Sequence, residues 1–292
     1  MRRTLRELDE YKVLIDQSLL EYMDNLGDGK LAKAMAYSVE QGGKRIRPVM
    51  ALVAGEMFGG SVEETMPLAM AIEMIHTYSL IHDDLPAMDN DDLRRGKPTN
   101  HKVFGEAMAI LAGDALLNEA HTLLIRSAVR CGVRGAEAAL TVSLAAGSVG
   151  MVEGQVRDLE NEGRIASYDE LKGCHELKTG MLIAASLEAP AVLFGASDDE
   201  RKAMRELGLK LGLAFQIKDD ILDRTSTKEV LGKTPGKDET SGKTTYVSLF
   251  GLEKSEEMAK GLTDECLGIL KGLDRDTAQL WEMCLALLQR NH

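Results

Sequence analysis

Three aspartates stand in a DDxxxxD pattern at the end of an apolar segment of this sequence. They are Asp83, Asp84 and Asp89, in IHDDLPAMD. Clustered carboxylates beside apolar residues repel one another unless cations neutralise them. Oxygen ligands suit Mg²⁺, which binds one or two carboxylates and keeps other positions for water and substrate phosphate. The three residues are therefore candidate metal ligands, whereas Asp91 and Asp92 are typical of a solvated loop.

A second acidic cluster lies in AFQIKDDILD. Gln216, Asp219, Asp220 and Asp223 occupy positions i, i+3, i+4 and i+7, so they share one face of a helix. Three carboxylates on one stripe make a poor isolated helix unless a metal ion neutralises them, although a surface stripe is the simpler alternative. If the helices that carry the two clusters face each other, the carboxylates would hold several magnesium ions over one diphosphate.

Basic residues are concentrated in QGGKRIRP. Lys44, Arg45 and Arg47 precede a helix that we expect to begin near Pro48. The glycines at 42–43 allow backbone amides to approach an anion, and the N-terminus of the helix adds a favourable dipole. An ordinary basic loop is the alternative, so this segment is a candidate diphosphate site only in the context of the acidic clusters.

Two further arginines follow the first acidic cluster directly. Because adjacent side chains point in different directions, Arg94 and Arg95 could each clamp a different phosphate. His76 precedes Asp83 by seven residues and shares its helix face, so a phosphate contact and an ordinary core position both remain open. Weaker candidates, each an ordinary solvated side chain if taken alone, are Lys178, Thr179 and Lys233.

The elements that must position these residues have a helical period almost throughout. Apolar residues occupy two faces of the segment 65–82, which indicates a buried central helix, and the helical pattern recurs in 207–222. No convincing period-2 strand is present. The sequence therefore predicts an all-α fold, a single domain over residues 1–292 in which many helices surround a central substrate cavity.

Composition narrows the class of function. The net charge of −12 argues against a nucleic-acid partner, which needs a basic surface. The four cysteines form no CxxC pair, and the N-terminal sequence has no apolar core typical of a signal peptide. The weakly polar stretch AALTVSLAAGSVGMV is too short for a membrane span. We therefore expect a cytoplasmic protein.

Together, these segments resemble the trans-isoprenyl diphosphate synthase (polyprenyl synthetase) family. The resemblance extends over nearly the whole chain and is carried by IHDDLPAMDNDDLRRG, GDALL, EGQ, LKTG, AFQIKDDILD and LGKTPGKD, in the order of the family. The spacing in DDLPAMD is similar to that of bacterial farnesyl and plant-type geranylgeranyl diphosphate synthases. The resemblance implies magnesium, with three ions at each site, and a homodimer.

The resemblance also implies a role for each candidate. Asp83 and Asp89 would bind magnesium on one wall with Asp84 close by, and Asp219 on the opposite wall would be supported by Asp220 and Asp223. Isopentenyl diphosphate would be held by Lys44, Arg47, His76 and Arg95. The allylic diphosphate would be held by Arg94, Lys178, Thr179, Gln216 and Lys233, with Lys178, Asp219 and Lys233 as catalytic residues.

The implied reaction joins isopentenyl diphosphate to dimethylallyl or geranyl diphosphate through an allylic carbocation, and releases diphosphate. A closing loop that carries Lys233 and Lys237 would exclude water from the cation. Tyr78 lies five residues before Asp83, about 7.5 Å along a helix axis, where its ring could form a floor for the growing tail. An aromatic residue here is typical of the farnesyl type, so the sequence predicts a fifteen-carbon product; a twenty-carbon product is the alternative.

Other classes of protein fit less of the sequence. A His–Asp metal phosphohydrolase needs an early histidine, yet His76 is the first in the chain, and it leaves DDILD unexplained. SGKTT lacks a glycine at the distance required by a nucleotide-binding P-loop. A terpene cyclase needs no second diphosphate site such as GGKRIRP. A non-catalytic subunit would be expected to have lost one of the aspartate clusters.

Overall fold

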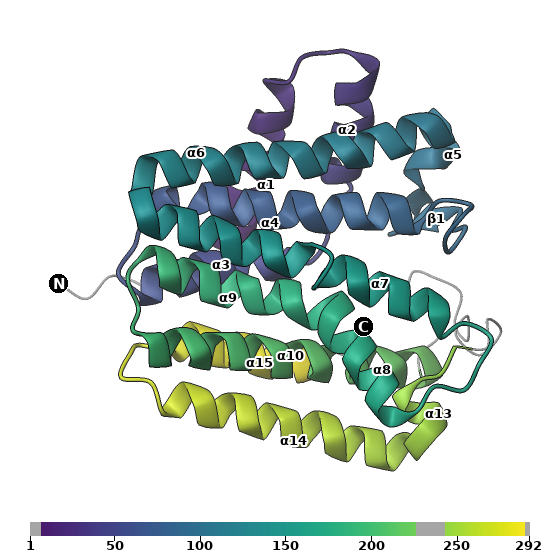
Figure 1. Ribbon diagram of the computed structural model, residues 1–292, viewed down its shortest axis with the longest axis vertical. Coiled ribbons are helices and arrows are strands. Elements are labelled where there is room, and N and C mark those ends of the chain that lie inside the picture. The colour runs from purple at the N-terminus through teal and green to yellow at the C-terminus, as the bar shows by residue number, and fades with distance from the viewer. Residues whose placement is uncertain (1–6, 226–242, 290–292) are drawn as a thin grey trace. The chain divides into compact units, whose positions relative to one another are not determined.

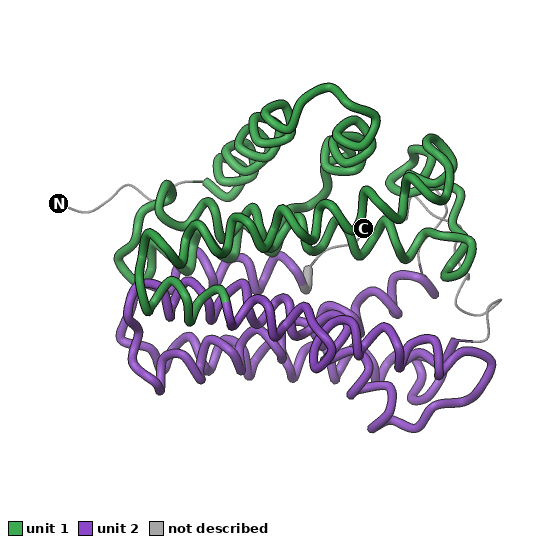
Figure 2. Tube along the Cα trace, turned by 45° about the horizontal axis from the view of Figure 1, so that its top comes forward, with its two compact units in different colours: residues 1–139 green, residues 140–292 purple. Residues whose placement is uncertain are grey.

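A computed structural model of the protein describes residues 7–225 and 243–289 (Figure 1). Helices make up nearly all the regular structure of these residues. This confirms the prediction of an all-α fold. The chain divides into two units, residues 1–139 and 140–292 (Figure 2). The single domain and the central cavity stay predictions.

The first unit is organised around α4. Its helices are α1 (Leu8–Asp24), α2 (Lys30–Glu40), α3 (Ile46–Met57), α4 (Val62–Asp83), α5 (Asn100–Phe104) and most of α6 (Glu106–Ala146). Ser61 and Glu64 form a reciprocal capping box that starts α4. Ile72, Met74 and Ile75 are fully buried although they point to different sides of the helix, and α1, α2 and α3 pack against it. The predicted buried central helix is confirmed within this unit.

A short hairpin follows α4 and was not predicted. Strands β1 (Leu93–Arg94) and β2 (Lys97–Pro98) pair antiparallel through a turn in which Arg95 and Gly96 have φ values of 54° and 77°. Positive φ at both central residues matches the twist of a two-residue hairpin. Strands of two residues are too short to show an alternating pattern, so no pattern of residues could predict them.

The second unit surrounds α10. Its remaining elements are α7 (Met151–Glu160), α8 (Tyr168–His175), the π-helical turn η1 (Glu176–Gly180), α9 (Met181–Leu193), α10 (Asp198–Thr225), α13 (Tyr246–Phe250), α14 (Leu252–Lys271) and α15 (Ala278–Gln289). Glycines bring α10 close to its neighbours. A Cβ on Gly208 would lie 2.3 Å from the Cα of Ala184 in α9, and one on Gly212 would lie 2.6 Å from the Cα of Gly180 in η1.

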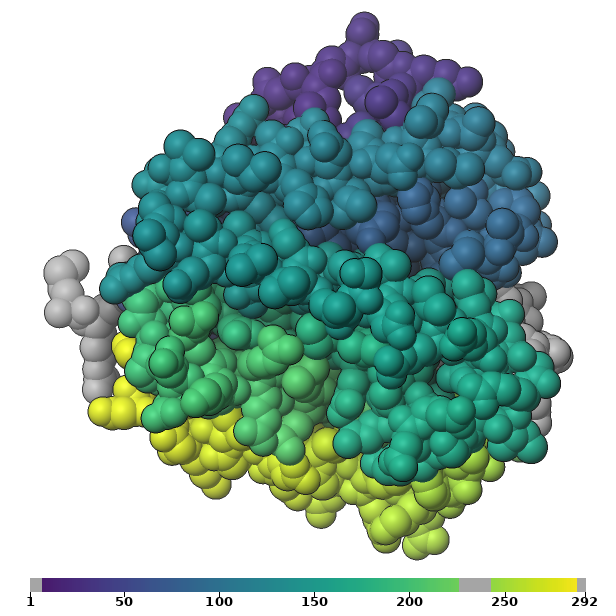
Figure 3. Space-filling model, viewed as in Figure 1, coloured from purple at the N-terminus to yellow at the C-terminus, as the bar shows by residue number. Residues whose placement is uncertain are grey.

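The long helix α6 has an apolar exposed side. Ile125, Val129 and Val133 are 62%, 83% and 76% exposed, and α6 lies at the surface in the view of Figure 3. The run Glu106–Glu160 is the one helical segment among the described residues that is long and apolar enough to cross a membrane. However, Gly132 breaks the helical geometry inside this run, with φ 65° and ψ −143°.

Candidate active site

The first aspartate cluster lies where α4 ends. Asp83 is the last residue of the helix and Asp84 is its C-cap. The following loop folds back on this end, because the N–H of Asp89 donates to the carbonyl of Asp83 at 2.9 Å and that of Asp91 donates to the carbonyl of Asp84 at 3.2 Å. Hydrogen bonds of the backbone thus hold Asp83 and Asp89, separated by five residues, at adjacent points of one loop.

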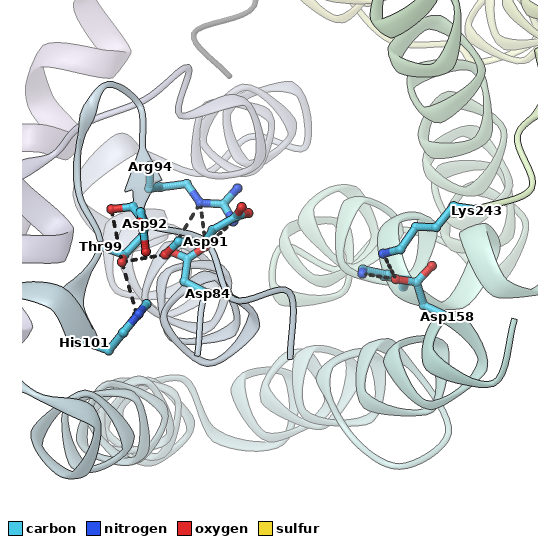
Figure 4. Close-up of polar contacts among 9 residues, drawn as sticks. Asp84, Asp91, Asp92, Arg94, Thr99, His101, Asp158 and Lys243 are labelled. Carbon is cyan, nitrogen blue, oxygen red and sulfur yellow. Dashed lines mark hydrogen bonds and ion pairs between the residues drawn. The ribbon is translucent and has the colours of Figure 1, made fainter. Parts of the chain in front are cut away.

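Asp84 is held by an arginine of the hairpin. Its side chain is buried and accepts hydrogen bonds from Arg94 Nε at 3.0 and 3.3 Å and from Nη2 (Figure 4). Arg94 Nη2 also lies 3.7 Å from Asp91 Oδ2. Burial raises the pKa of Asp84 above its ordinary value, although Arg94 opposes the shift. The predicted magnesium contact of Asp84 stays a prediction, since this carboxylate already pairs with Arg94 here.

The hairpin is fixed to the helices around it. Thr99 Oγ1 donates to the carbonyl of Asp91 at 2.7 Å (Figure 4). Asn100 Nδ2 donates to the carbonyl of Ala34 in α2 at 2.7 Å. Asp92 is exposed and pairs with Lys102 at 2.9 Å, which agrees with its interpretation as part of a solvated loop. These contacts fix the position of Arg94 relative to the end of α4.

The basic segment differs from expectation at one residue. Helix α3 begins at Ile46, two residues earlier than expected, so that Pro48 lies in its first turn. Arg45 is buried, adopts φ 48°, and donates to Asp16 at 2.8 Å, to Glu73 at 2.6 Å and to the carbonyl of Val39 at 2.6 Å. The expectation that Arg45 belongs to an anion-facing basic loop is wrong, because its guanidinium is occupied inside the unit.

The other basic residues of this unit come together. Arg95 Nη1 donates to the carbonyl of Gly42, and a Cβ on Gly43, whose φ is 133°, would lie 2.5 Å from the Cζ of Arg95.

Burial and then the charges of Arg47, Arg95 and Arg94 lower the pKa of His76 well below its usual range. Burial and these positive charges therefore favour a neutral His76. Lys44 is exposed at the end of the same loop. A hollow beside the cluster is lined by residues that include Ser38, Gln41, Thr77, Arg94 and Arg95.

The second aspartate cluster has unequal members. Asp220 is 5% exposed and accepts hydrogen bonds from the N–H of Tyr246 at 2.9 Å and from Gln216 Nε2 at 3.2 Å. Thr179 Oγ1 lies 3.5 Å from Gln216 Oε1. Asp219 and Asp223 are half-buried on the same helix. Asp220 thus joins α10 to α13 in this structure, and its predicted contact with magnesium stays a prediction.

A third charged cluster was missed by the sequence analysis. Asp158 of α7 accepts hydrogen bonds at its Oδ2 from Lys178 Nζ at 2.7 Å and from Lys243 Nζ at 3.2 Å (Figure 4). Lys243 Nζ also lies 3.5 Å from Glu162. The available signal was the EGQ motif, whose glutamine precedes Asp158 by three residues. The glycine of this motif, Gly154, indicates close packing of its helix against a neighbour, and Asp158 lies one turn later on the same face.

The remaining candidates from the sequence are Tyr78 and Lys233. Tyr78 is 7% exposed within α4, and its ring packs edge-on against His82 with centroids 5.7 Å apart. Lys233 and the loop that carries it with Lys237 lie outside the described residues. Over the described residues, no group of three histidine, cysteine, aspartate or glutamate side chains is preassembled to hold a metal ion.

Comparison with known proteins places the chain in a family. The family model for polyprenyl synthetase matches residues 28–283. The chain belongs to the polyprenyl synthetase family. This confirms the resemblance deduced from the aspartate-rich, basic and EGQ segments.

Relatives within the polyprenyl synthetase family resemble this chain over most of its length. Farnesyl diphosphate synthase of Geobacillus stearothermophilus is 46% identical, with 98% of this chain and 97% of the relative covered. The large subunit 1 of the heterodimeric geranylgeranyl pyrophosphate synthase of Arabidopsis thaliana is 49% identical, with 85% and 68% covered. A solved geranyltransferase of Helicobacter pylori, complexed with magnesium and isoprenyl diphosphate, is 35% identical with a TM-score of 0.81 and 98% of each chain covered.

Proposed function

We propose that this polyprenyl synthetase is a farnesyl diphosphate synthase, which condenses isopentenyl diphosphate with dimethylallyl or geranyl diphosphate. The observation that carries the proposal is that Arg94 and Arg95 line one hollow together with Asp84, at the aspartate loop of α4. The 46% identity to a bacterial farnesyl diphosphate synthase supports the same activity. A geranylgeranyl diphosphate synthase is the second candidate, favoured by the 49% identity to the Arabidopsis subunit.

In this proposal, basic residues of the first unit bind isopentenyl diphosphate. Lys44, Arg47 and Arg95 provide positive charge, and Arg guanidiniums bind phosphate oxygens through paired donors. The lowered pKa of His76 keeps it neutral, so it offers one N–H donor without adding charge to the guanidiniums. Because Arg45 fixes this loop from inside, the remaining side chains need little reordering to bind an anion.

The allylic diphosphate is assigned in this proposal to Arg94, Lys178, Thr179, Gln216 and Lys233, as the family resemblance implies. Both Lys178 and Thr179 lie on the π-helical turn η1, and such wider turns are frequent at functional sites. Cationic side chains stabilise the charge that develops on the departing diphosphate, which leaves an allylic cation. The double bond of isopentenyl diphosphate attacks this cation, and a proton is then lost to the released diphosphate.

The donor atoms of both aspartate clusters fit magnesium. Asp83 and Asp89 project from adjacent points of one loop, and Asp219 and Asp223 lie one turn apart on α10. Carboxylate oxygens in this number are the ligands that magnesium prefers, and a bound ion would supply charge stabilisation to the diphosphate. Asp84 and Asp220, which accept hydrogen bonds from Arg94 and Tyr246, would orient the neighbouring ligands. Three ions at each site remain part of the proposal.

Substitution of one aspartate in the loop tests this assignment. Asp83→Asn removes a proposed ligand, and we expect kcat for condensation to fall by at least about a hundredfold, because several kcal/mol of charge stabilisation are lost. Asp92→Asn in the same loop is the matched control, since the side chain of Asp92 is exposed and pairs with Lys102. Equal activity of the two variants at saturating magnesium would refute the assignment.

We also propose that the protein is a cytoplasmic homodimer. The exposed apolar residues Ile125 and Val129 lie one turn apart on α6, before the break at Gly132, and offer a surface suited to a second copy. The relative named as a subunit of a heterodimer supports assembly within the family. The four cysteines are free, and three of them are buried, which is consistent with a reducing compartment.

A further inference from the structure

Asp158 lies between two lysines that come from distant parts of the second unit. Lys178 is on η1 and Lys243 precedes α13, yet both ammonium groups bind the same carboxylate oxygen, Oδ2. The side chains of Asp158, Lys178 and Lys243 are 16%, 24% and 22% exposed, so water screens the three charges less than it screens a surface ion pair. The two lysines lower the pKa of Asp158, although burial opposes the shift, so the carboxylate is ionised at neutral pH.

The backbone is shaped to bring Asp158 to Lys178. Gly154 precedes Asp158 by four residues and shares its face of α7. A Cβ at position 154 would lie 2.1 Å from the backbone nitrogen of Lys178, so only glycine allows α7 to approach η1 this closely. Gly154 also accepts a hydrogen bond at its carbonyl from Cys174 Sγ at 3.5 Å. The contact between Asp158 and Lys178 is thus fixed by the packing of two elements as well as by charge.

We propose that Asp158 is a positioning residue, which holds the ammonium groups of Lys178 and Lys243 together in the orientation in which they meet the allylic diphosphate. This inference rests on the proposed function of Lys178. A lysine has four rotatable side-chain bonds, and ordering it only when substrate binds would weaken the interaction. Two ammonium groups also repel each other, and the shared carboxylate offsets this repulsion before the diphosphate arrives.

The test combines kinetics with the reactivity of the lysines. Purified wild-type protein and the variants Asp158→Asn, Lys178→Met and the double variant would receive isopentenyl and geranyl diphosphate with magnesium. We expect each single variant to lower kcat by about tenfold or more, and the double variant to lose less than the product of the two single effects, because only the positioning of Lys243 remains to be lost once Lys178 is gone. Glu160→Gln, an exposed acid on the same helix, is the matched control and should keep wild-type rates.

Lysine acetylation, followed by mass spectrometry of the protein without substrate, provides a readout that does not depend on activity. In Asp158→Asn, acetylation of Lys178 and Lys243 should accelerate several-fold, while Lys172, which is half-buried and pairs with Glu176, should react as in the wild type. Multiplicative kinetic effects, increased activity of Asp158→Asn or unchanged acetylation would overturn the positioning role. If the wild-type protein condenses nothing but Asp158→Asn still accelerates acetylation of Lys178 and Lys243, the proposed function is refuted, whereas the contact of Asp158 with the two lysines stands.

Discussion

Tyr78 is the residue that we propose limits the length of the product. It is 7% exposed inside α4 and packs against His82, one turn nearer to the aspartate loop. Replacement of this ring by a methyl group, in Tyr78→Ala, should lengthen the product beyond fifteen carbons, because the floor proposed for the growing tail is removed. Product analysis by mass spectrometry checks this. Tyr78→Phe keeps the ring and should keep the product, and an unchanged product from Tyr78→Ala would refute the floor.

Burial of the His175 imidazole makes the free energy of unfolding depend on pH. Burial lowers its pKa to about 4, although Asp158 opposes the shift, and over the described residues its Nδ1 has no hydrogen-bond partner. The unfolded chain, with a histidine pKa near 6.5, therefore binds the extra proton between pH 6.5 and 4, so stability falls as pH falls through this range.

Substitution of His175 isolates this effect. Between pH 7 and 5, wild-type protein should lose about 2 kcal/mol more unfolding free energy than His175→Phe, as measured by urea denaturation. The expected difference is the linkage energy of the single imidazole, since every other titrating group is shared by the two proteins. Parallel pH dependence in the two proteins would contradict the assignment of a buried neutral imidazole.

Individual residues also mark the limit of prediction from this sequence. The i, i+3, i+4, i+7 spacing placed Gln216, Asp219, Asp220 and Asp223 on one helix face, and the structure has one continuous α10 there. The spacing could not reveal that Asp220 accepts a hydrogen bond from Tyr246, because that partner is 26 residues away. Asp158 was missed for the same reason, since its two lysines are 20 and 85 residues distant.

At the scale of elements, Arg45 connects three helices of the first unit. It bonds Asp16 of α1, Glu73 of α4 and the carbonyl of Val39 in α2, and it is 4% exposed. Its neighbours Lys44 and Arg47 are basic as well, so the sequence does not single out Arg45, whose backbone adopts a left-handed φ of 48°. The sequence therefore predicted the helix that follows but not the anchor that fixes its start.

Arg45→Met should destabilise the protein by about 3 kcal/mol, because it leaves the carboxylate of Glu73 buried without its arginine. Urea denaturation measures the change. Lys44→Met, at the exposed neighbouring position, should alter stability by less than about 0.5 kcal/mol. Adding Glu73→Leu to Arg45→Met should recover much of the loss. If the double variant is as unstable as the sum of both single variants, the buried-charge explanation fails.

At the scale of the whole molecule, the apolar side of α6 bears on assembly. Val129 is 83% exposed, which is unusual for a large apolar side chain that has no partner surface. Wild-type protein at micromolar concentration should sediment as a dimer, and Val129→Glu should shift it to a monomer. Val13→Glu, at a 53% exposed position on α1, should remain dimeric. A wild-type monomer, or a protein that floats with phosphatidylglycerol vesicles instead, would contradict the dimer.

Analysis of the condensation product tests the proposed reaction. Purified protein would receive isopentenyl diphosphate and geranyl diphosphate, with magnesium in one sample and with a chelator in another, followed by mass spectrometry. We expect farnesyl diphosphate only where magnesium is present. A twenty-carbon product would keep the chemistry but contradict the role of Tyr78. If neither geranyl nor dimethylallyl diphosphate is elongated with magnesium present, the proposed function is wrong.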